Sequence, residues 1–368
     1  MKIREIVVRI IDADGLSFSL GEGFRLGQEL LLVEVVTDSG ARGTGGTSTY
    51  GNGRELVESI LSTYAPMLLG RDPFDTEGFW KRALGVIKLY AAPQAAAALD
   101  LALWDLIGTL AQQPVYRLLG GGRERIPVYG SLPHLPTVEE HVELIDAYRS
   151  ERGLTAFKIH LSGRVRDDLR LVEELRERVG DETVLLADAV GHYDYTDALR
   201  VGRALESAGF EWFEMPMEDY LEEGYRKLSS TLEIPITTGE VTNATLFANA
   251  NAIAGRGWSI VRGDVANWGG ITQGRKLSAL AEAFGLRCEF HSWGFAVNQF
   301  ANLHAMLPCP TSRYFEWPIP PQPFEFGFAP VVVRDGFAAA PTLPGLGLVP
   351  DVDRLDRGEQ FREVFARE

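Results

Sequence analysis

Short runs of apolar and β-branched residues alternate with amphipathic stretches over most of the chain. From residue 126 onward, each run ends in polar residues, and most are followed by apolar positions at helical spacing, as in residues 167–179, 195–208 and 274–284. The runs are residues 127–131, 156–160, 184–188, 212–214, 236–240, 259–264, 287–291 and 314–316. Alternation of this kind indicates parallel strands joined by crossover helices, and eight such strands predict a closed β/α barrel over residues 126–320.

The pattern before the barrel is different. Predicted strands cover residues 3–11 and 30–36, and predicted helices cover residues 53–69 and 93–110. These elements predict a separate N-terminal α+β domain, residues 1–125. The C-terminal segment, residues 321–368, is rich in Pro and Phe and is then punctuated by Gly and Pro. We expect this segment to return to the N-terminal domain or to cover the barrel.

The chain is acidic, which excludes some classes of partner. Its 368 residues include 36 Lys and Arg against 51 Asp and Glu, a formal charge of −15 without a basic cluster. Nucleic acids and anionic membrane surfaces are bound through clustered Lys and Arg, so neither is an expected partner. The Ala-rich stretch 91–110 carries Asp100 and Asp105 and is a poor membrane span. Cys288 and Cys309 have no metal-ligand or redox spacing, which favours a reduced, cytoplasmic protein.

Ionisable residues recur where the predicted barrel strands end. They are Lys158, His160, Asp188, Glu214, Glu240, Asp264, His291 and Glu316, and from Lys158 onward each strand end follows the previous one by 24 to 30 residues. A single polar residue at such a position is explained by its nearness to solvent. Recurrence at successive strand ends is not, because a β/α barrel carries its active site at the C-terminal rim of its strands.

Three of these residues predict a metal site. Asp188, Glu214 and Glu240 end adjacent strands, so their carboxylates are expected to converge and to require a counter-charge. Oxygen-only ligands favour a hard ion, Mg²⁺ before Mn²⁺ or Ca²⁺, and the lack of His or Cys in this trio disfavours zinc. The alternative is a set of carboxylates paired with arginines, which we disfavour because no arginine recurs in step with the strand ends.

The remaining residues predict acid–base chemistry on both sides of that metal. Asp264 beside His291 fixes the tautomer of the imidazole and raises its pKa, which makes it a competent general base. Lys158 and His160 are two residues apart on one strand, so both point into the barrel. A metal between two bases suits removal of the proton α to a carboxylate, with Glu316 hydrogen-bonded to the second carboxylate oxygen of the enediolate.

With these residues in view, nearly the whole chain resembles the mandelate racemase-like subgroup of the enolase superfamily. The segments that carry the resemblance are residues 98–106 (ALDLALWDL), 114–121 (PVYRLLGG), 263–272 (GDVANWGGIT) and 344–347 (PGLG). The resemblance implies a (β/α)₇β modified TIM barrel under an α+β capping domain, and a symmetric homo-oligomer. It also implies that residues 14–27 and 43–53 are capping loops that set specificity.

The resemblance implies roles for the strand-end residues as well. Asp188, Glu214 and Glu240 would bind Mg²⁺, and His291 would form an acid/base dyad with Asp264. Lys158 would lie beside the substrate carboxylate or act as a base, and Glu316 would be a hydrogen-bond donor or an acid. Three positions depart from the family pattern. His160 stands where many relatives have a second lysine, Val190 replaces an asparagine that often contacts the substrate's α-hydroxyl, and Met215 replaces the second Glu of Glu-Glu-Pro.

The leading hypothesis for the function is dehydration of a sugar acid to a 2-keto-3-deoxy acid, with His291 as the base at C2. The substrate is then a small-molecule carboxylate. The alternatives within the superfamily are a racemase or epimerase and a lactone or anhydrosugar cycloisomerase, which bases on both faces permit. A catalytically silent barrel that only binds ligands is disfavoured, because it gives no reason for Lys158 and the three carboxylates to occur together. A metal-dependent hydrolase is disfavoured by the lack of a His-rich metal site.

Overall fold

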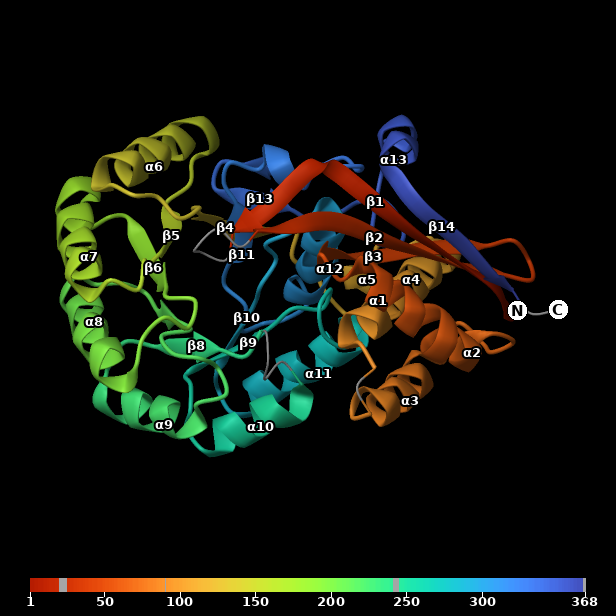
Figure 1. Ribbon diagram of the computed structural model, residues 1–368, viewed down its shortest axis with the longest axis horizontal. Coiled ribbons are helices and arrows are strands. Elements are labelled where there is room, and N and C mark those ends of the chain that lie inside the picture. Colours follow the sequence, from red (N-terminus) through yellow and green to blue (C-terminus); the bar gives the residue numbers. More distant parts are fainter. Residues whose placement is uncertain (20–24, 90, 241–244, 367–368) are drawn as a thin grey trace.

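A computed structural model describes residues 1–19, 25–89, 91–240 and 245–366. The chain forms a barrel of parallel strands with an α/β cap beside it (Figure 1). This arrangement confirms the predicted fold class. The barrel strands are β4 (Arg125–Ser131), β5 (Ala156–His160), β6 (Val184–Asp188), β7 (Phe213–Glu214), β8 (Ile236–Thr238), β9 (Ile260–Gly263), β10 (Arg287–Phe290) and β11 (Phe315–Pro318).

Parallel pairing follows chain order from β4 to β10, and β11 pairs in parallel with β4. The Ser292 hydroxyl after β10 donates to the carbonyl of Glu316 on β11 at 2.7 Å, which joins the two ends of the sheet. Helices form an outer layer around the strands (Figure 1). They are α6 (Val138–Arg152), α7 (Val165–Val179), α8 (Tyr195–Ser207), α9 (Glu222–Thr231), α10 (Leu246–Ala254), α11 (Gly270–Ala283) and α12 (Ala296–Met306).

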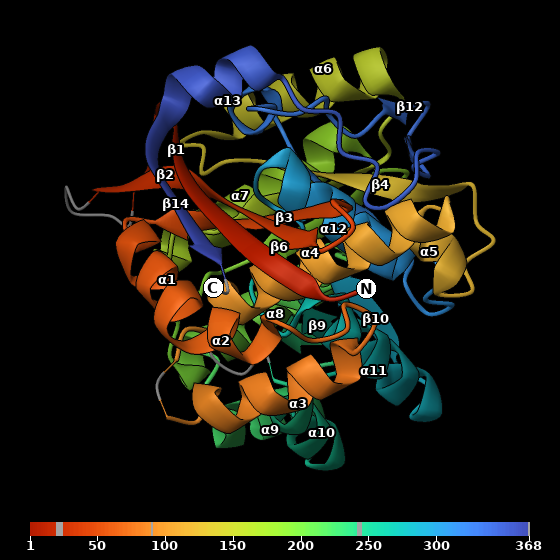
Figure 2. The same cartoon turned by 90° about the vertical axis from the view of Figure 1, so that its right-hand side faces the viewer.

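The cap is an antiparallel sheet in the order β14-β1-β2-β3 with helices on one side (Figures 1 and 2). Its strands are β1 (Ile3–Ser19), β2 (Arg25–Thr37), β3 (Arg42–Tyr50) and β14 (Glu359–Ala366). Its helices are α1 (Gly53–Ser59), the π-helical segment η1 (Ile60–Tyr64), α2 (Ala65–Leu68), α3 (Thr76–Ile87) and α4 (Pro93–Ala111). β14 pairs with β1, so a segment from beyond the barrel completes the cap sheet.

Smaller elements connect these parts. They are α5 (Val115–Leu118), the 3₁₀ helix η2 (Gln322–Phe324), the hairpin β12 (Val333–Arg334) and β13 (Phe337–Ala339), and α13 (Val352–Gly358). β13 pairs antiparallel with β4 near the start of the first barrel strand. The hairpin therefore covers the end of the barrel that faces away from the strand C-termini.

Three local predictions for the cap differ from the structure. The strands predicted at residues 3–11 and 30–36 are longer in the structure, where they are β1 and β2, and both enter the segment 14–27 that was expected to be a loop. Residues 20–24 of that segment lie outside the described residues. The expected capping loop at residues 43–53 is largely the strand β3. This strand was not predicted because it is rich in glycine, a residue that is uncommon in strands. The helix predicted at 53–69 is interrupted by η1.

Helix α4 packs closely on β3 because glycines remove side chains from the contact. A Cβ atom at Gly45 would overlap the Ala98 carbonyl oxygen, and one at Gly43 would overlap that of Ala102. Among the described residues, α4 is the one helix long and apolar enough to cross a membrane. However, 72% of its apolar window is buried inside the protein, which is the pattern of a core helix.

We predict that Gly45→Ala lowers the free energy of unfolding by about 1–3 kcal/mol, the usual cost of overpacking a filled contact. The matched control is Gly85→Ala on α3, where a Cβ meets no atom within 4 Å and alanine favours the helix. Denaturant melts of both variants test this prediction. Equal stabilities would show that the α4–β3 contact does not depend on glycine.

Candidate active site

The predicted site residues gather at the C-terminal ends of the barrel strands. Lys158 and His160 lie on β5, Asp188 ends β6 and Glu214 ends β7. Glu240, Asp264 and His291 follow β8, β9 and β10, while Glu316 lies inside β11, two residues before that strand ends. Below them the barrel interior is filled by an apolar layer that includes Tyr129, Leu186, Trp212 and Ile260. The site therefore has a dry floor.

Lys158 lies at the centre of the predicted residues. Its ammonium is 2.7 Å from Glu316, 3.0 Å from Glu214 and 3.2 Å from Asp188. Burial acts to lower the pKa of Lys158, but Glu214 and Glu316 outweigh it and hold this pKa well above its usual range. Lys158 is therefore cationic, and the buried ammonium is explained by its three carboxylate partners.

The expectation that no arginine accompanies the strand ends was wrong. Arg262 on β9 is fully buried, with its guanidinium 2.8 Å from Glu214 and 3.0 Å from Glu316, and it also binds Glu240. Arg262 precedes Asp264 by two residues, so the alternation of side chains along a strand places both on the inward face. The sequence therefore indicated an inward-facing arginine on this strand, two residues before the residue at the rim.

The three expected metal ligands are linked through these two cations. Lys158 bridges Asp188 and Glu214, and Arg262 bridges Glu214 and Glu240. As the described side chains are placed, no three His, Cys, Asp or Glu residues form a metal-binding group. The carboxylates are turned toward Lys158 and Arg262 instead.

The donor chemistry and charge of the site nevertheless fit a divalent cation. Within the described part of the chain, the site gathers carboxylates of Asp188, Glu214, Glu240, Asp264 and Glu316 around three cationic groups, those of Lys158, Arg262 and His291. Full ionisation leaves an excess of two negative charges. Burial, outweighing the nearby cations, raises the pKa of Glu214 to about 8, so a proton offsets part of this excess. One divalent ion on oxygen ligands would neutralise it.

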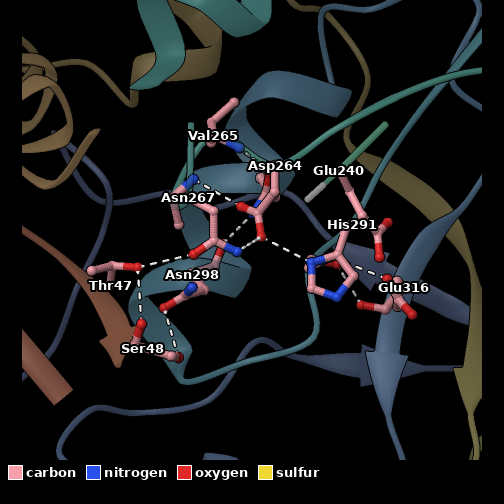
Figure 3. A network of polar contacts seen from close by, with 12 residues as sticks. Thr47, Ser48, Glu240, Asp264, Val265, Asn267, His291, Asn298 and Glu316 are labelled. Atoms are coloured by element: carbon pink, nitrogen blue, oxygen red, sulfur yellow. Dashed lines mark hydrogen bonds and ion pairs between the residues drawn. The ribbon is translucent and has the colours of Figure 1, made fainter. Parts of the chain in front are cut away.

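His291 and Asp264 form a tightly held pair on one side of the site (Figure 3). The imidazole Nδ1 lies 2.8 Å from Asp264 Oδ2, and Asp264 also accepts hydrogen bonds from Asn267 at 2.7 Å and Asn302 at 2.8 Å. Burial favours the neutral ring, but Glu240, Glu316 and Asp264 together raise the pKa of His291 to about 9. Because Nδ1–H is bound by Asp264, the other ring nitrogen is available for proton transfer.

Hydrogen bonds connect this pair to the cap (Figure 3). Thr47 on β3 donates to Asn267 at 3.3 Å, and Ser48 donates to Asn298 on α12 at 3.3 Å. Asn267 therefore bonds both to the cap and to Asp264. Sequence reasoning missed these asparagines, because they lie in the loop after β9 and on α12 and give no periodic signal.

His160 lies on the opposite side, against Asp188. Its Nδ1 is 2.6 Å from the Leu132 carbonyl oxygen, which fixes a proton on Nδ1, and its Nε2 is 3.5 Å from Asp188 Oδ2. The ring of His134 lies 5.0 Å from that of His160, and His192 lies 6.4 Å from His134. An open cavity of about 670 Å³ is lined by His134, His160 and the starts of α6 and α7. Neither His134 nor His192 was predicted from the sequence.

Two residues that follow the carboxylates have unusual backbone conformations. Val190 has φ +49° and Met215 has φ +37°, a region that β-branched residues avoid. The amide of Val190 donates to Asp188 Oδ1 at 2.9 Å, so this turn holds the carboxylate in place. Both residues stand where the resemblance described above implies a departure from the family pattern.

Comparisons with known proteins agree with this geometry. Residues 140–354 match the family model described as enolase C-terminal domain-like, and residues 8–120 match the mandelate racemase/muconate lactonizing enzyme N-terminal domain. The 3,6-anhydro-alpha-L-galactonate cycloisomerase of Streptomyces coelicolor is 31% identical over 346 residues, which cover 89% of this chain and 91% of that protein. The L-talarate/galactarate dehydratase of Salmonella typhimurium is 29% identical over 297 residues, 78% of this chain and 73% of that protein.

A solved structure extends the likeness to the whole chain. The crystal structure of a mandelate racemase/muconate lactonizing protein from Paracoccus denitrificans, complexed with magnesium, matches with a TM-score of 0.86 at 29% identity. The match covers 98% of both chains. The chain therefore belongs to the mandelate racemase/muconate lactonizing enzyme family of the enolase superfamily and is an enzyme of the lyase or isomerase type.

Proposed function

We propose that this enzyme dehydrates a sugar acid to a 2-keto-3-deoxy acid, by Mg²⁺-dependent removal of the proton α to the carboxylate. The observation that carries the proposal is the position of the carboxylates of Asp188, Glu214 and Glu240 between two imidazoles, His291 and His160. Sugar-acid dehydratases among the relatives support the substrate class and the reaction.

Asp188, Glu214 and Glu240 would hold Mg²⁺, or Mn²⁺ in its place. The ion, when bound, stabilises negative charge that develops on the substrate carboxylate. Lys158 would lie beside that carboxylate as a positive charge, or act as a base when Mg²⁺ rather than Lys158 holds Asp188 and Glu214. Glu316 is ion-paired with Lys158 and accepts a hydrogen bond from Arg262. Although burial opposes it, these two cations hold the pKa of Glu316 well below its usual range, so its hydrogen bond to the second carboxylate oxygen requires a proton taken up with the substrate.

His291 takes the proton from C2 and returns a proton to the departing 3-hydroxyl. Asp264 supports both steps, because it keeps the proton on Nδ1 and stabilises the imidazolium that forms. The asparagines that bond Asp264 hold its carboxylate in one orientation. The apolar layer under the site, including Trp212, closes the site from below.

A racemase, epimerase or cycloisomerase is the second candidate, and the position of His160 favours it. His160 approaches the site from β5, across the carboxylates from His291 on the β10 side, so protons can be exchanged on either face. The cycloisomerase relative supports the same reading. Product analysis separates a dehydratase from a racemase or epimerase, because dehydration gives a 2-keto acid that reacts with semicarbazide and epimerisation does not. A cycloisomerase is recognised by its cyclic substrate, a lactone or anhydrosugar acid.

We also propose a homo-oligomer in the cytoplasm as the working form of the enzyme. Both cysteines, Cys288 and Cys309, are free thiols in the barrel, which supports a reducing compartment. Size-exclusion chromatography with light scattering tests the oligomeric state.

We predict that chelation abolishes turnover and that Mg²⁺ restores it. Glu240→Gln should lower kcat/KM by at least about 100-fold, because it removes one anionic ligand. Glu233→Gln, an exposed glutamate before the same strand, is the matched control and should leave activity unchanged. Turnover is measured on a panel of mono- and diacid sugars. Full activity after exhaustive chelation would exclude the proposed metal chemistry.

We predict that His291 and His160 act on opposite faces of C2. His291→Asn should abolish dehydration and exchange of the C2 proton in the substrate, while the C2 epimer, whose proton faces His160, should still exchange with D₂O. In an epimerase, His291→Asn and His160→Ala should each abolish net turnover. Mass spectrometry of recovered substrate and product measures exchange. Wild-type turnover in His291→Asn would refute the mechanism, and unchanged activity in both Lys158→Ala and His160→Ala would refute the second face.

We predict that Asp264→Asn shifts the pH dependence of kcat/KM. If the neutral imidazole is the base, activity rises with pH through the pKa of His291, and Mg²⁺ on Glu240 places this rise below about 9. Asp264 raises this pKa, so its loss should move the rise to lower pH while lowering the plateau by at least about 100-fold. A pH–rate profile of both proteins, with Mg²⁺ constant, tests the prediction. A shift to higher pH would contradict it.

A further inference from the structure

Arg262 is the largest buried cation of the site, and the mechanism proposed above gives it no role beyond its contact with Glu316. The side chain is fully buried, and its guanidinium binds Glu214, Glu240 and Glu316 while lying 3.4 Å from the Tyr129 hydroxyl. An arginine keeps its charge at any pH at which a protein folds, so burial cannot neutralise it. Its position is favourable only because these carboxylates surround it.

The contacts of Arg262 overlap with the expected metal ligands. Glu214 Oε1 accepts from Lys158 at 3.0 Å and lies 2.8 Å from Arg262, so both cations use the oxygen that a metal would need. Glu240 is bound by Arg262 through Nε. Glu316, which is not an expected ligand, is bound by the same guanidinium at 3.0 Å.

We propose that Arg262 is the counter-ion that the divalent cation displaces. In the metal-free protein it holds Glu214 and Glu240 and relieves their repulsion. When the cation binds, both carboxylates turn from Arg262 to the metal, and Arg262 remains on Glu316 as its positioning residue. This inference rests on the proposed function, because it takes the same carboxylates as ligands of Mg²⁺.

The electrostatics of the site give the direction of the effect. A guanidinium that shares ligands with a divalent ion repels it and competes for its oxygens, so Arg262 weakens metal binding. In return, it stabilises the metal-free fold, where buried carboxylates without a counter-charge strongly destabilise. Removal of Arg262 should therefore loosen the metal-free protein and tighten its binding of Mg²⁺. A purely structural arginine would give only the first effect.

The experiment compares wild type, Arg262→Gln, Arg262→Lys and a control, Arg287→Gln. Arg287 also pairs with a buried carboxylate of the barrel, Glu289, at 2.7 Å, but on β10 at the end away from the site. Thermal melting with EDTA or Mg²⁺ gives the stabilisation by the ion. Titration calorimetry with Mg²⁺ alone gives its Kd.

In Arg262→Gln we expect a lower Tm in EDTA, a larger upward shift with Mg²⁺ than in wild type, and a Kd for Mg²⁺ at least about tenfold lower. Arg262→Lys keeps the charge but cannot span both carboxylates, so it should change in the same direction by less. It also serves as the test if Arg262→Gln does not fold. Arg287→Gln should lower the Tm equally in EDTA and Mg²⁺ and leave the Kd unchanged.

If wild type binds Mg²⁺ but the Kd is unchanged or higher in both Arg262 variants, the displacement of Arg262 by the metal would be overturned. The proposed function would be unaffected by this result. Wild-type protein that binds no Mg²⁺ would overturn the proposed function and the displacement with it. A change in Kd for Arg287→Gln as large as that for Arg262→Gln would also overturn the inference, since the effect would then be a general consequence of weakening the barrel.

Discussion

Mutual repulsion among buried carboxylates is the constraint on which the rest of this site depends. Asp188, Glu214 and Glu316 are nearly or fully buried, and each contacts Lys158. Although burial opposes it, Lys158 and then His160 keep the pKa of Asp188 well below its usual range. Arg262 supplies the second fixed charge. The barrel mouth is thus a set of partly compensated charges on an apolar floor, and any ligand that enters it alters this compensation.

The barrel could be predicted from the sequence because its signal repeats. Each β/α unit presents an apolar run, a polar strand end and a helix, so errors at one unit leave the others intact. The cap has no such repetition. β3 carries glycines where a strand usually carries bulky residues, because α4 packs directly on its backbone, and this closeness is a tertiary property that the strand pattern does not contain.

The sequence predicted the site residues at the strand ends, but not those deeper in the barrel or in the surrounding loops and helices. Lys158, His160 and the later carboxylates were expected at the mouth, and the structure places them there. Arg262 lies deeper on its strand, where polar residues are disfavoured unless paired, so its role depends on neighbours distant in sequence. Asn267 and Asn302 could not be predicted for the same reason, because the role of each comes from its hydrogen bond to Asp264 in the folded protein.

The pairing of β14 with β1 also affects how the chain assembles. Arg9 on β1 binds Glu359 at the start of β14, 350 residues later in the chain. During synthesis the N-terminal strands leave the ribosome early, yet their sheet keeps an open edge until the whole barrel has been made. Thr47 and Ser48, which connect the cap to the catalytic pair, belong to that same sheet. Completion of the active site is therefore tied to arrival of a strand that touches no reacting group.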